Sequence, residues 1–512
     1  MLLRSIFSFL IILVLISCKS QKETTDVLKD DSMITLKFVQ LNDVYEIAPL
    51  SGGKYGGMAR VAYVTDSIRK SHPNTYLVMA GDFLNPSLLG TIKVDGERIR
   101  GRQMIEVMNA MDFSLVTFGN HEFDLDEEGL QKRLDESNFQ WISSNVRQRK
   151  ELANVPFSMT RGIGNIKVPD LYNLTVSDTD GTTVNIGFFS VTLDSNPKDY
   201  VWYGDIYSET ERAYNELKSN SEVIIGLTHV KLEDDQEFAR RFQDIDLIMG
   251  GHEHNNMIYE IGNTVVAKAD ANAKSIYVHT IIYNKMTGET KTESVLFPID
   301  EEIPSDPEVE QIVSKWNLIL ENEIREVIPN PYEIIYYADP PLDGTDSANR
   351  GVQTNMGDII TAAMAFSYDD EVEGAIVNGG SIRLDDMLAG EVTSIDVFRV
   401  LPFGGSALKV DLTGELLKEI LDFGKSKGGT GAYLQRHNIS ESADGGWLIK
   451  GEPLVEGKRY YTVAISDFLL KGYDIPFLTP DNQGILKIYT PSENEIANDL
   501  RKAVILYLKS IK

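Results

Sequence analysis

Residues 33–46 read MITLKFVQLNDVYE, a mostly apolar run that ends in polar residues around Asp43. The run MITLKFVQL has the length and composition of a buried β-strand. Two later stretches, MAGDF at 79–83 and FGNHEFD at 118–124, also place Asp, Asn and His at the end of an apolar run. Polar residues that follow several strands in this way are typical of α/β folds, where binding groups gather at strand ends.

The same pattern extends along the rest of the chain. Over residues 33–300, short apolar strands alternate with helical stretches, which predicts an α/β domain. Residues 301–330 contain apolar residues at helical spacing, with Asp306 or Ser305 as the candidate cap, and we expect a helical connector. Strands and helices alternate again over residues 331–512, which predicts a second α/β domain.

Composition indicates a globular protein and excludes some partners. A chain of 512 residues is longer than one core usually organises, and 42% hydrophobic and 25% charged residues give no reason to propose disorder. A formal net charge of -28 argues against nucleic acid or an anionic membrane surface as partner. A phosphate substrate would therefore need a locally positive pocket, and bound metal ions could supply that charge. No protein partner is implied.

The N-terminus predicts export. Residues 1–17 carry one basic residue, Arg4, and an apolar run too short for a comfortable bilayer span, as in a signal peptide. The end of this segment, LISC, resembles the bacterial lipobox, which implies lipidation at Cys18; an ordinary signal peptide with an incidental cysteine is the alternative. Residues 18–32 are mostly polar and predict a flexible tether. We expect a lipid anchor in a bacterial membrane, on its periplasmic or cell-surface face.

Six candidate metal ligands lie within a few residues after predicted strands: Asp43, Asp82, Asn120, His229, His252 and His254. Their mixture of carboxylate, amide and imidazole suits Mn, Zn, Fe or Co better than Ca or Mg alone, and the number of ligands suggests two ions. Two ions can clamp a phosphate and activate a water molecule. Near them, Asp124 could orient and charge His121 as an acid or a transition-state stabiliser.

In this order, DVY, GD, GNHEFD, TH and GGHEH resemble the motifs of the 5′-nucleotidase family of metallophosphoesterases. The resemblance implies an N-terminal calcineurin-like αββα sandwich and a C-terminal α/β 5′-nucleotidase substrate-binding domain. It also implies that Asp82 bridges two divalent ions, and that His121 with Asp124 stabilises the transferred phosphoryl group. The remaining ligands would divide between the ions, with Asp43 and His254 on the first and Asn120, His229 and His252 on the second.

Tyr45 departs from this resemblance, because it stands where the family has a histidine ligand. A neutral phenol is a poor ligand, since its ordinary pKa is about 10. Tyr45 could bind as a phenolate, water could replace the imidazole, or Glu46 could reach in. We favour water or a hydrogen bond from Tyr45, and we expect a weaker first metal site.

Four stretches of the second domain, ANRGVQTNMGDIITAAM, IVNGGSIR, LPFGGS and SDFLLKGYD, resemble the nucleotide-binding motifs of that family. Arginine fits phosphate or carboxylate, and aromatic rings can sandwich a base. The candidate substrate-binding residues are Arg350, Asn378, Arg383, Phe403, Phe468 and Asp474. KGYD replaces the GGDG common in relatives, so Lys471 and Tyr473 leave base and ribose specificity open.

These observations predict an exported enzyme that hydrolyses nucleotides to nucleoside and phosphate with a metal-activated hydroxide. The cofactors would be two divalent ions, chosen from Mn, Zn, Co, Fe or Mg. An active relative that uses UDP-sugars, 2′,3′-cyclic nucleotides or other phosphate esters is one alternative. A nucleotide-binding lipoprotein with impaired catalysis is the other.

Overall fold

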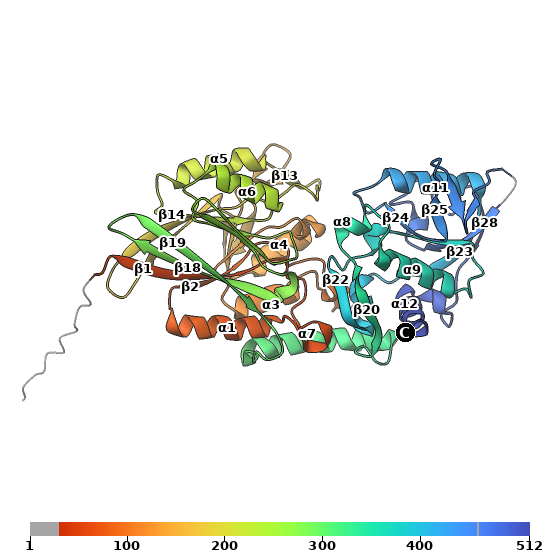
Figure 1. The fold of residues 1–512 in the computed structure, drawn as a ribbon, viewed down its shortest axis with the longest axis horizontal. Coiled ribbons are helices and arrows are strands. Elements are labelled where there is room, and N and C mark those ends of the chain that lie inside the picture. Colours follow the sequence, from red (N-terminus) through yellow and green to blue (C-terminus); the bar gives the residue numbers. More distant parts are fainter. Residues whose placement is uncertain (1–29, 458–459) are drawn as a thin grey trace, which may run out of the picture.

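A computed structural model of the chain describes residues 30–457 and 460–512 (Figure 1). The predicted signal segment 1–17, Cys18 and nearly all of the tether 18–32 lie outside these residues. Within the described ranges, no helix has both the length and the apolar content needed to cross a membrane.

The first half of the chain forms two six-stranded sheets. The first has the order β19 (Glu289–Pro298), β18 (Ser275–Asn284), β1 (Met33–Leu41), β2 (Thr75–Met79), β5 (Leu115–Thr117) and β6 (Gln140–Ile142). The second has the order β11 (Leu171–Ser177), β12 (Thr183–Phe189), β14 (Val223–Thr228), β15 (Leu247–Gly250), β17 (Thr264–Lys268) and β16 (Met257–Ile261). In the first sheet, four neighbouring strands run parallel to one another: β1, β2, β5 and β6. In the second sheet, the four parallel strands are β12, β14, β15 and β17.

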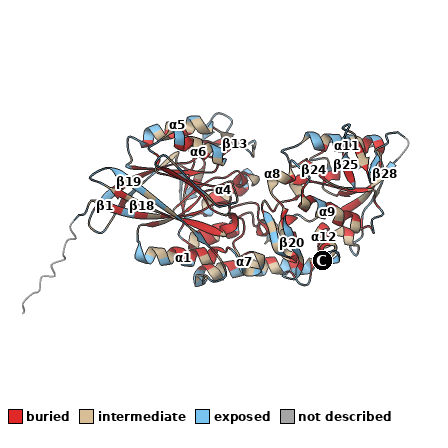
Figure 2. Ribbon diagram, viewed as in Figure 1, coloured by how far each residue is buried: buried red, intermediate tan, exposed pale blue. Residues whose placement is uncertain are grey.

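The two sheets pack face to face. Ile34, Leu36 and Phe38 alternate along β1 and join one core with Phe188 of β12, and the rings of Phe38 and Phe188 meet edge to face at 5.7 Å. The outer faces are covered by helices α1 (Met58–Ser71), α3 (Arg102–Ala110), α4 (Glu127–Glu136), α5 (Ile206–Leu217) and α6 (Leu232–Arg241). Buried residues concentrate between these layers (Figure 2), which form the predicted αββα sandwich.

A long helix, α7 (Pro307–Val327), connects the two halves of the chain. Asp306 caps it by accepting hydrogen bonds from the backbone N–H groups of Glu308 and Val309, and Pro307 occupies the first turn, where its missing N–H costs nothing. Its apolar face packs on α1 and α3, and the indole N–H of Trp316 donates to Glu106 at 2.9 Å. The connector is therefore attached to the N-terminal sandwich.

The second half of the chain is built on a five-stranded sheet of order β24 (Leu434–His437), β21 (Gly374–Asn378), β28 (Tyr460–Ser466), β23 (Ala407–Thr413) and β29 (Ile485–Tyr489). Helix α11 (Gly414–Ser426) packs on one face, and helices α9 (Asn355–Phe366) and α12 (Leu500–Ser510) lie on the other. A separate antiparallel pair, β20 (Ile334–Asp343) and β22 (Met387–Thr393), lies toward the N-terminal sandwich (Figure 1).

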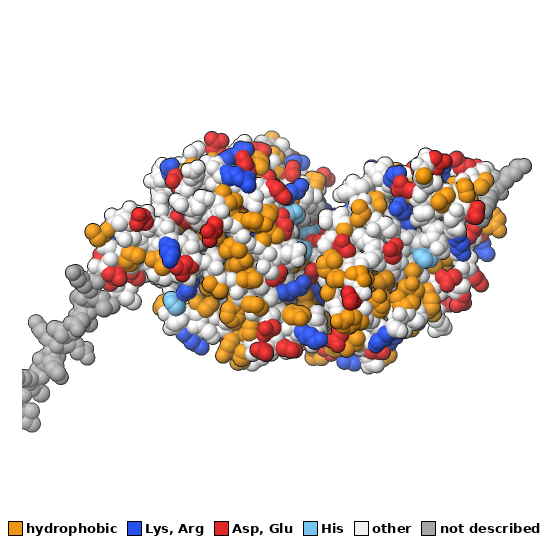
Figure 3. All heavy atoms as spheres, viewed as in Figure 1, with side chains coloured by type: hydrophobic (Ala, Val, Ile, Leu, Met, Phe, Trp, Pro, Cys, Tyr) orange, Lys and Arg blue, Asp and Glu red, His pale blue; other side chains and the backbone are white. Residues whose placement is uncertain are grey.

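Ion pairs join the two halves of the molecule. They include Lys54–Glu391 at 2.6 Å, Lys274–Asp386 at 2.5 Å and Arg383–Asp124 at 2.7 Å. Histidine side chains are visible in the notch between the halves (Figure 3). The site described next lies at this junction.

Candidate functional site

The six candidate metal ligands lie on loops that leave the carboxyl ends of parallel strands. Asp43, Asp82 and Asn120 follow β1, β2 and β5 of the first sheet. His229 follows β14, and the segment with His252 and His254 follows β15 of the second sheet. Because the two sheets stack with these edges together, ligands from distant positions in the sequence reach one place.

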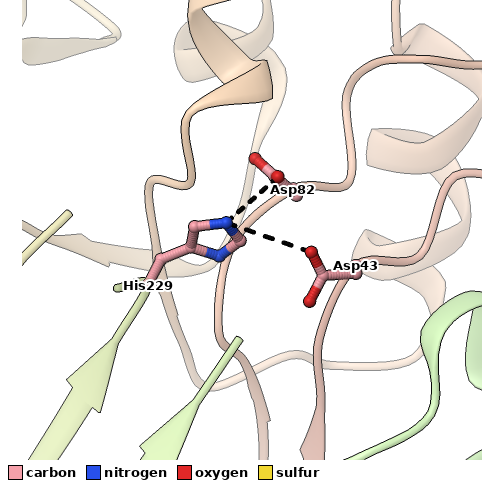
Figure 4. Close-up of side chains that lie close together, drawn as sticks. All are labelled: Asp43, Asp82 and His229. Atoms are coloured by element: carbon pink, nitrogen blue, oxygen red, sulfur yellow. Dashed lines mark ion pairs between the residues drawn. The ribbon is translucent and has the colours of Figure 1, made fainter. Parts of the chain in front are cut away.

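Asp43, Asp82 and His229 form the centre of this group, and their ligand atoms lie within 4.8 Å of one another (Figure 4). His229 Nε2 is 3.0 Å from Asp82 Oδ2 and 3.9 Å from Asp43 Oδ1. All three side chains are buried. Two carboxylates and an imidazole at these separations can hold a divalent cation.

Hydrogen bonds aim these side chains into the site. His229 Nδ1 bonds the backbone carbonyl of Ala80 at 2.8 Å, which leaves Nε2 toward the carboxylates. Asp82 Oδ1 accepts from the backbone N–H of His121 at 2.7 Å, and Asp43 Oδ2 accepts from that of His252 at 2.9 Å. Each side chain thus keeps one ligand atom that these bonds do not use, namely His229 Nε2, Asp82 Oδ2 and Asp43 Oδ1.

Three buried atoms of the candidate ligands make no hydrogen bond to the described residues: Asp43 Oδ1, Asn120 Oδ1 and His229 Nε2. Leaving such polar atoms buried without partners costs free energy, so each calls for an explanation. All three are donor types that divalent transition metals accept. The residues present therefore fit a metal centre, and the Asp43, Asp82 and His229 group supports the predicted use of metal ions.

The charges of the group depend on one another. Burial acts to raise the pKa of Asp43, but His229 and His254 outweigh it and lower that pKa to about 2. Burial acts to lower the pKa of His229, but Asp82 and Asp43 raise it to about 9. His252 differs, because burial and the neighbouring His229 lower its pKa to about 4. Its ring lies 5.5 Å from that of His229.

Tyr45 lies at this site as an intact phenol. Its hydroxyl is 3.1 Å from His254 Nε2, and its ring contacts His121 edge to face at 6.1 Å. Burial and the carboxylates of Asp82 and Asp43 raise the pKa of Tyr45 well above its ordinary value. The geometry agrees with a hydrogen-bonding role for the phenol.

Glu46 points away from the site. Its carboxylate accepts a hydrogen bond of 3.2 Å from the backbone N–H of Leu88 and lies 4.0 Å from Arg399 Nε. Its side chain lines a separate cavity of about 530 Å³. In this arrangement Glu46 does not replace the missing imidazole.

His121 and Asp124 form a tight pair. His121 Nδ1 lies 2.8 Å from Asp124 Oδ2, which also accepts from Asn85 at 2.6 Å and from Arg383 at 2.7 Å. Burial acts to lower the pKa of His121, but Asp124 and Asp82 raise it well above its ordinary value. The imidazole is therefore held cationic beside the candidate ligands.

Glu122, one residue further on, organises the loops of the site and was given no role from the sequence. Its buried carboxylate accepts hydrogen bonds from four backbone N–H groups, those of Asp82, Phe83, Leu84 and Gly119. Burial and the nearby Asp82 raise the pKa of Glu122 to about 7. Its place in GNHEFD, between His121 and Asp124, was the signal that could have indicated this role.

A cavity of about 400 Å³ opens at the junction of the two halves. Asn120, His121, His252 and His254 line it from the N-terminal side. Arg350 lines it from the C-terminal side, where it also pairs with Asp346. The structure thus brings one predicted phosphate-binding arginine beside the metal group, and Arg383 reaches the same region through Asp124.

The other predicted substrate-binding residues lie elsewhere in the C-terminal half. Asn378 Nδ2 donates to Asp474 Oδ2 at 2.7 Å. Phe403 is 60% exposed, and the ring of Phe468 contacts that of Tyr473 at 5.9 Å. These residues do not line the 400 Å³ cavity, so the structure does not join them to the metal group directly.

Two further residues of the cavity, Asp346 and Asp385, were not singled out in the sequence. Asp346 is partly buried, and burial and the neighbouring Asp385 raise its pKa. Asp385 follows the quoted stretch IVNGGSIR by two positions and lies against His121 and His254. No sequence pattern could reveal this contact, because it depends on how the two halves meet.

Two family models match consecutive parts of the chain. The model described as calcineurin-like phosphoesterase matches residues 36–256. The model described as 5′-nucleotidase, C-terminal domain matches residues 334–479, so the two together span most of the chain. The chain belongs to the 5′-nucleotidase family of metallophosphoesterases. This membership confirms the predicted family and fold class, and it makes the chain a metal-dependent phosphoester hydrolase by class.

Individual members of the 5′-nucleotidase family align over much of the chain. The 5′-nucleotidase of Bos taurus is 28% identical over 475 residues, which are 82% of this chain and 78% of that protein. The trifunctional nucleotide phosphoesterase protein of Bacillus subtilis is 28% identical over 72% of this chain and 27% of its own. The solved 5′-nucleotidase precursor of Thermus thermophilus has a TM-score of 0.65 at 21% identity, covering 94% of this chain and 97% of that one.

Proposed function

We propose that the protein hydrolyses nucleoside 5′-monophosphates to nucleoside and inorganic phosphate. One observation carries the proposal: the paired His121 and Asp124 line the same cavity as Arg350 and three of the candidate metal ligands, Asn120, His252 and His254. Such a site combines cations, an imidazolium and a guanidinium, all of which stabilise a phosphate. Their positive charge also offsets the net charge of -28 that would otherwise repel a nucleotide.

We propose that two divalent ions, drawn from Mn, Zn, Co, Fe or Mg, bind here. Asp82 would bridge them, Asp43 and His254 would hold the first, and the second would take Asn120, His229 and His252. When bound, such ions supply Lewis acidity toward the phosphoryl oxygens and lower the pKa of a coordinated water.

His121 would act on the phosphate directly. Asp124 holds its Nδ1, so the N–H at Nε2, which lies 3.5 Å from Asp385 Oδ2 in this arrangement, is the one that would turn to substrate. A cationic imidazole there would stabilise charge on the phosphoryl oxygens and could give a proton to the leaving 5′-oxygen. Arg383, bonded to the same carboxylate, would keep Asp124 ionised through this step.

In the C-terminal domain, Arg350, Arg383 and Asn378 would bind phosphate, and Asp474 would accept from the ribose hydroxyls. The pair Phe403 and Phe468 would clamp the base, with stacking worth about 1 kcal/mol per ring. The exposure of Phe403 supports the clamp, since a core phenylalanine would be covered.

The base clamp has a direct test. We expect Phe403→Ala and Phe468→Ala each to raise KM for AMP about fivefold or more, because each removes a stacking ring. Turnover of an aryl phosphate, which has no nucleobase, should stay within about twofold. Phosphate release under steady-state conditions measures both. Equal losses on the two substrates would contradict a base clamp.

Two alternative functions are tested by assaying phosphate release from a panel of substrates. Lys471 and Tyr473 lie beside Phe468, and Tyr473 is 75% exposed, so the turn could favour UDP-sugars, 2′,3′-cyclic nucleotides or another ester. The printed name of the Bacillus subtilis relative, a trifunctional nucleotide phosphoesterase, supports keeping these substrates in the panel. Nucleotide binding without phosphate release would instead support an impaired, nucleotide-binding lipoprotein.

We also propose export and lipid anchoring at Cys18, on the sequence of residues 1–18 alone. Phosphate released outside the cytoplasm could then be taken up with the nucleoside. The test is metabolic labelling with a fatty-acid probe, in which Cys18→Ser should abolish incorporation. Labelling that survives Cys18→Ser would contradict the anchor.

A further inference from the structure

The carboxylate of Asp385 belongs to the C-terminal half of the chain but lies among candidate metal ligands of the N-terminal half. Its Oδ2 atom is 3.5 Å from His254 Nε2 and 3.5 Å from His121 Nε2. Its Oδ1 atom accepts a hydrogen bond of 2.8 Å from the backbone N–H of Asp346. This bond orients the carboxylate so that Oδ2 faces the two histidines.

The first metal position has few ligands of its own. Apart from the bridging Asp82, it has Asp43 Oδ1 and His254 Nε2, which lie 3.4 Å apart. Transition-metal ions in proteins usually take four or more ligands. The Tyr45 hydroxyl lies 3.1 Å from His254 Nε2, and Glu46 accepts a hydrogen bond from the backbone N–H of Leu88, so each has another partner in this arrangement.

We propose that Asp385 is a ligand of the ion held by Asp43 and His254, and that the C-terminal domain supplies it. His254 Nε2 lies within 3.5 Å of a carboxylate oxygen from each of these two aspartates, one from each half of the chain. An ion among these three groups would meet oxygen and nitrogen donors that suit it. The inference rests on the two-metal function proposed above.

A simple ion pair with the histidines does not account for all of the geometry. Asp43 Oδ1 is buried, lies 3.4 Å from His254 Nε2 and makes no hydrogen bond, so its acceptor capacity at this position is not used. Asp385 also has a left-handed backbone, with φ 47°, as do Asp43 at 53° and Asp82 at 56°. Residues held in this conformation are concentrated at binding sites.

A ligand from the second domain couples metal binding to the way the two domains meet. The segment around Asp385 makes two more contacts across the junction, because Arg383 bonds Asp124 and Asp386 pairs with Lys274. If the domains separated, these contacts and the Asp385 ligand would be lost together. The first ion would therefore bind more tightly in the closed arrangement.

The test is a titration of metal-stripped protein with Mn²⁺ by isothermal titration calorimetry, without substrate. We expect Asp385→Asn to weaken one of two sites by about tenfold or more, because a charged donor is lost. Asparagine keeps an oxygen to accept from the N–H of Asp346, so the loop retains its bond. The matched control is Asp386→Asn, which removes a neighbouring contact across the junction and should change both affinities by less than about threefold.

Tyr45→His makes the test specific. An imidazole at position 45 would supply the missing donor, so adding Asp385→Asn in that background should weaken Mn²⁺ binding by less than about threefold. Unchanged Mn²⁺ affinities in Asp385→Asn, or equal losses in Asp385→Asn and Asp386→Asn, would overturn the proposal. Unchanged affinity with faster phosphate release would also overturn it, by showing that the carboxylate competes with substrate. A wild-type protein that binds two ions but releases no phosphate would contradict the proposed function alone.

Discussion

At the scale of single residues, the site depends on polar atoms with defined partners. Asp124 contacts His121, Asn85 and Arg383, so one carboxylate joins the candidate catalytic histidine to both halves of the molecule. His121 has no candidate ligand role in the metal group. Its effect on rate can therefore be separated from its effect on metal binding.

We predict that His121→Ala lowers kcat for AMP by about 10²- to 10³-fold, because it removes the cation that stabilises the phosphoryl group. Mn²⁺ binding should remain at two ions per chain. Steady-state phosphate release and calorimetric titration measure the two effects. A variant that keeps wild-type turnover would contradict the assigned role.

The sequence alone predicted the six candidate ligands, His121 and Asp124, because each falls in a short motif after a strand. It could not predict Asp385, since no local pattern distinguishes this aspartate from the adjacent Asp386. Its position follows only from how the domains meet. The roles of all these residues stay predictions until variants are measured.

At the scale of elements, the apolar run MITLKFVQL is predicted as a buried strand and forms β1 (Met33–Leu41), because continuous apolar runs mark buried parallel strands. The last helix, α12, begins at Leu500, where Asp499 caps it by accepting from the backbone N–H of Arg501. A short 3-10 turn, Ile496–Asn498, occupies the preceding residues. The domain limits 33–300, 301–330 and 331–512 stay predictions.

His279 on β18 makes the first sheet sensitive to acid. Its buried ring bonds Gln40 at 2.8 Å and Ser294 at 2.7 Å, and burial lowers its pKa from 6.5 to about 3. As the pH falls through about 6.5, the imidazole of His279 therefore becomes protonated in the unfolded chain but stays neutral in the folded chain. Stability from the neutral ring is fully present above that pH and is lost as the pH falls toward 3.

We predict that the contribution of His279 to the free energy of unfolding falls by about 2 kcal/mol as the pH is lowered from about 7.5 to about 5. The comparison is with His279→Gln, which keeps hydrogen-bonding groups but does not titrate. Urea unfolding of both proteins across this pH range gives the difference in unfolding free energy. That difference should shrink by the stated amount as pH falls, whereas parallel curves would show that His279 does not titrate as described.

At the scale of the whole molecule, the two domains meet over the site. Asp43, Asp82 and His229 come from the N-terminal sandwich, while Arg350 and Asp385 enter from the C-terminal half. The clamp residues Phe403 and Phe468 do not line the same cavity. We therefore expect substrate to bring base and phosphate sites together, through a change in how the domains sit.

The proposed site hydrolyses nucleotides with bound metal ions. The most direct measurement is phosphate release from AMP by metal-stripped protein, before and after addition of Mn, Zn, Co or Mg. UDP-glucose, a cyclic nucleotide and an aryl phosphate serve as comparison substrates. We predict no release without metal, and rapid release from AMP once a suitable ion is restored. AMP that binds tightly but yields no phosphate with any of these ions would contradict the account.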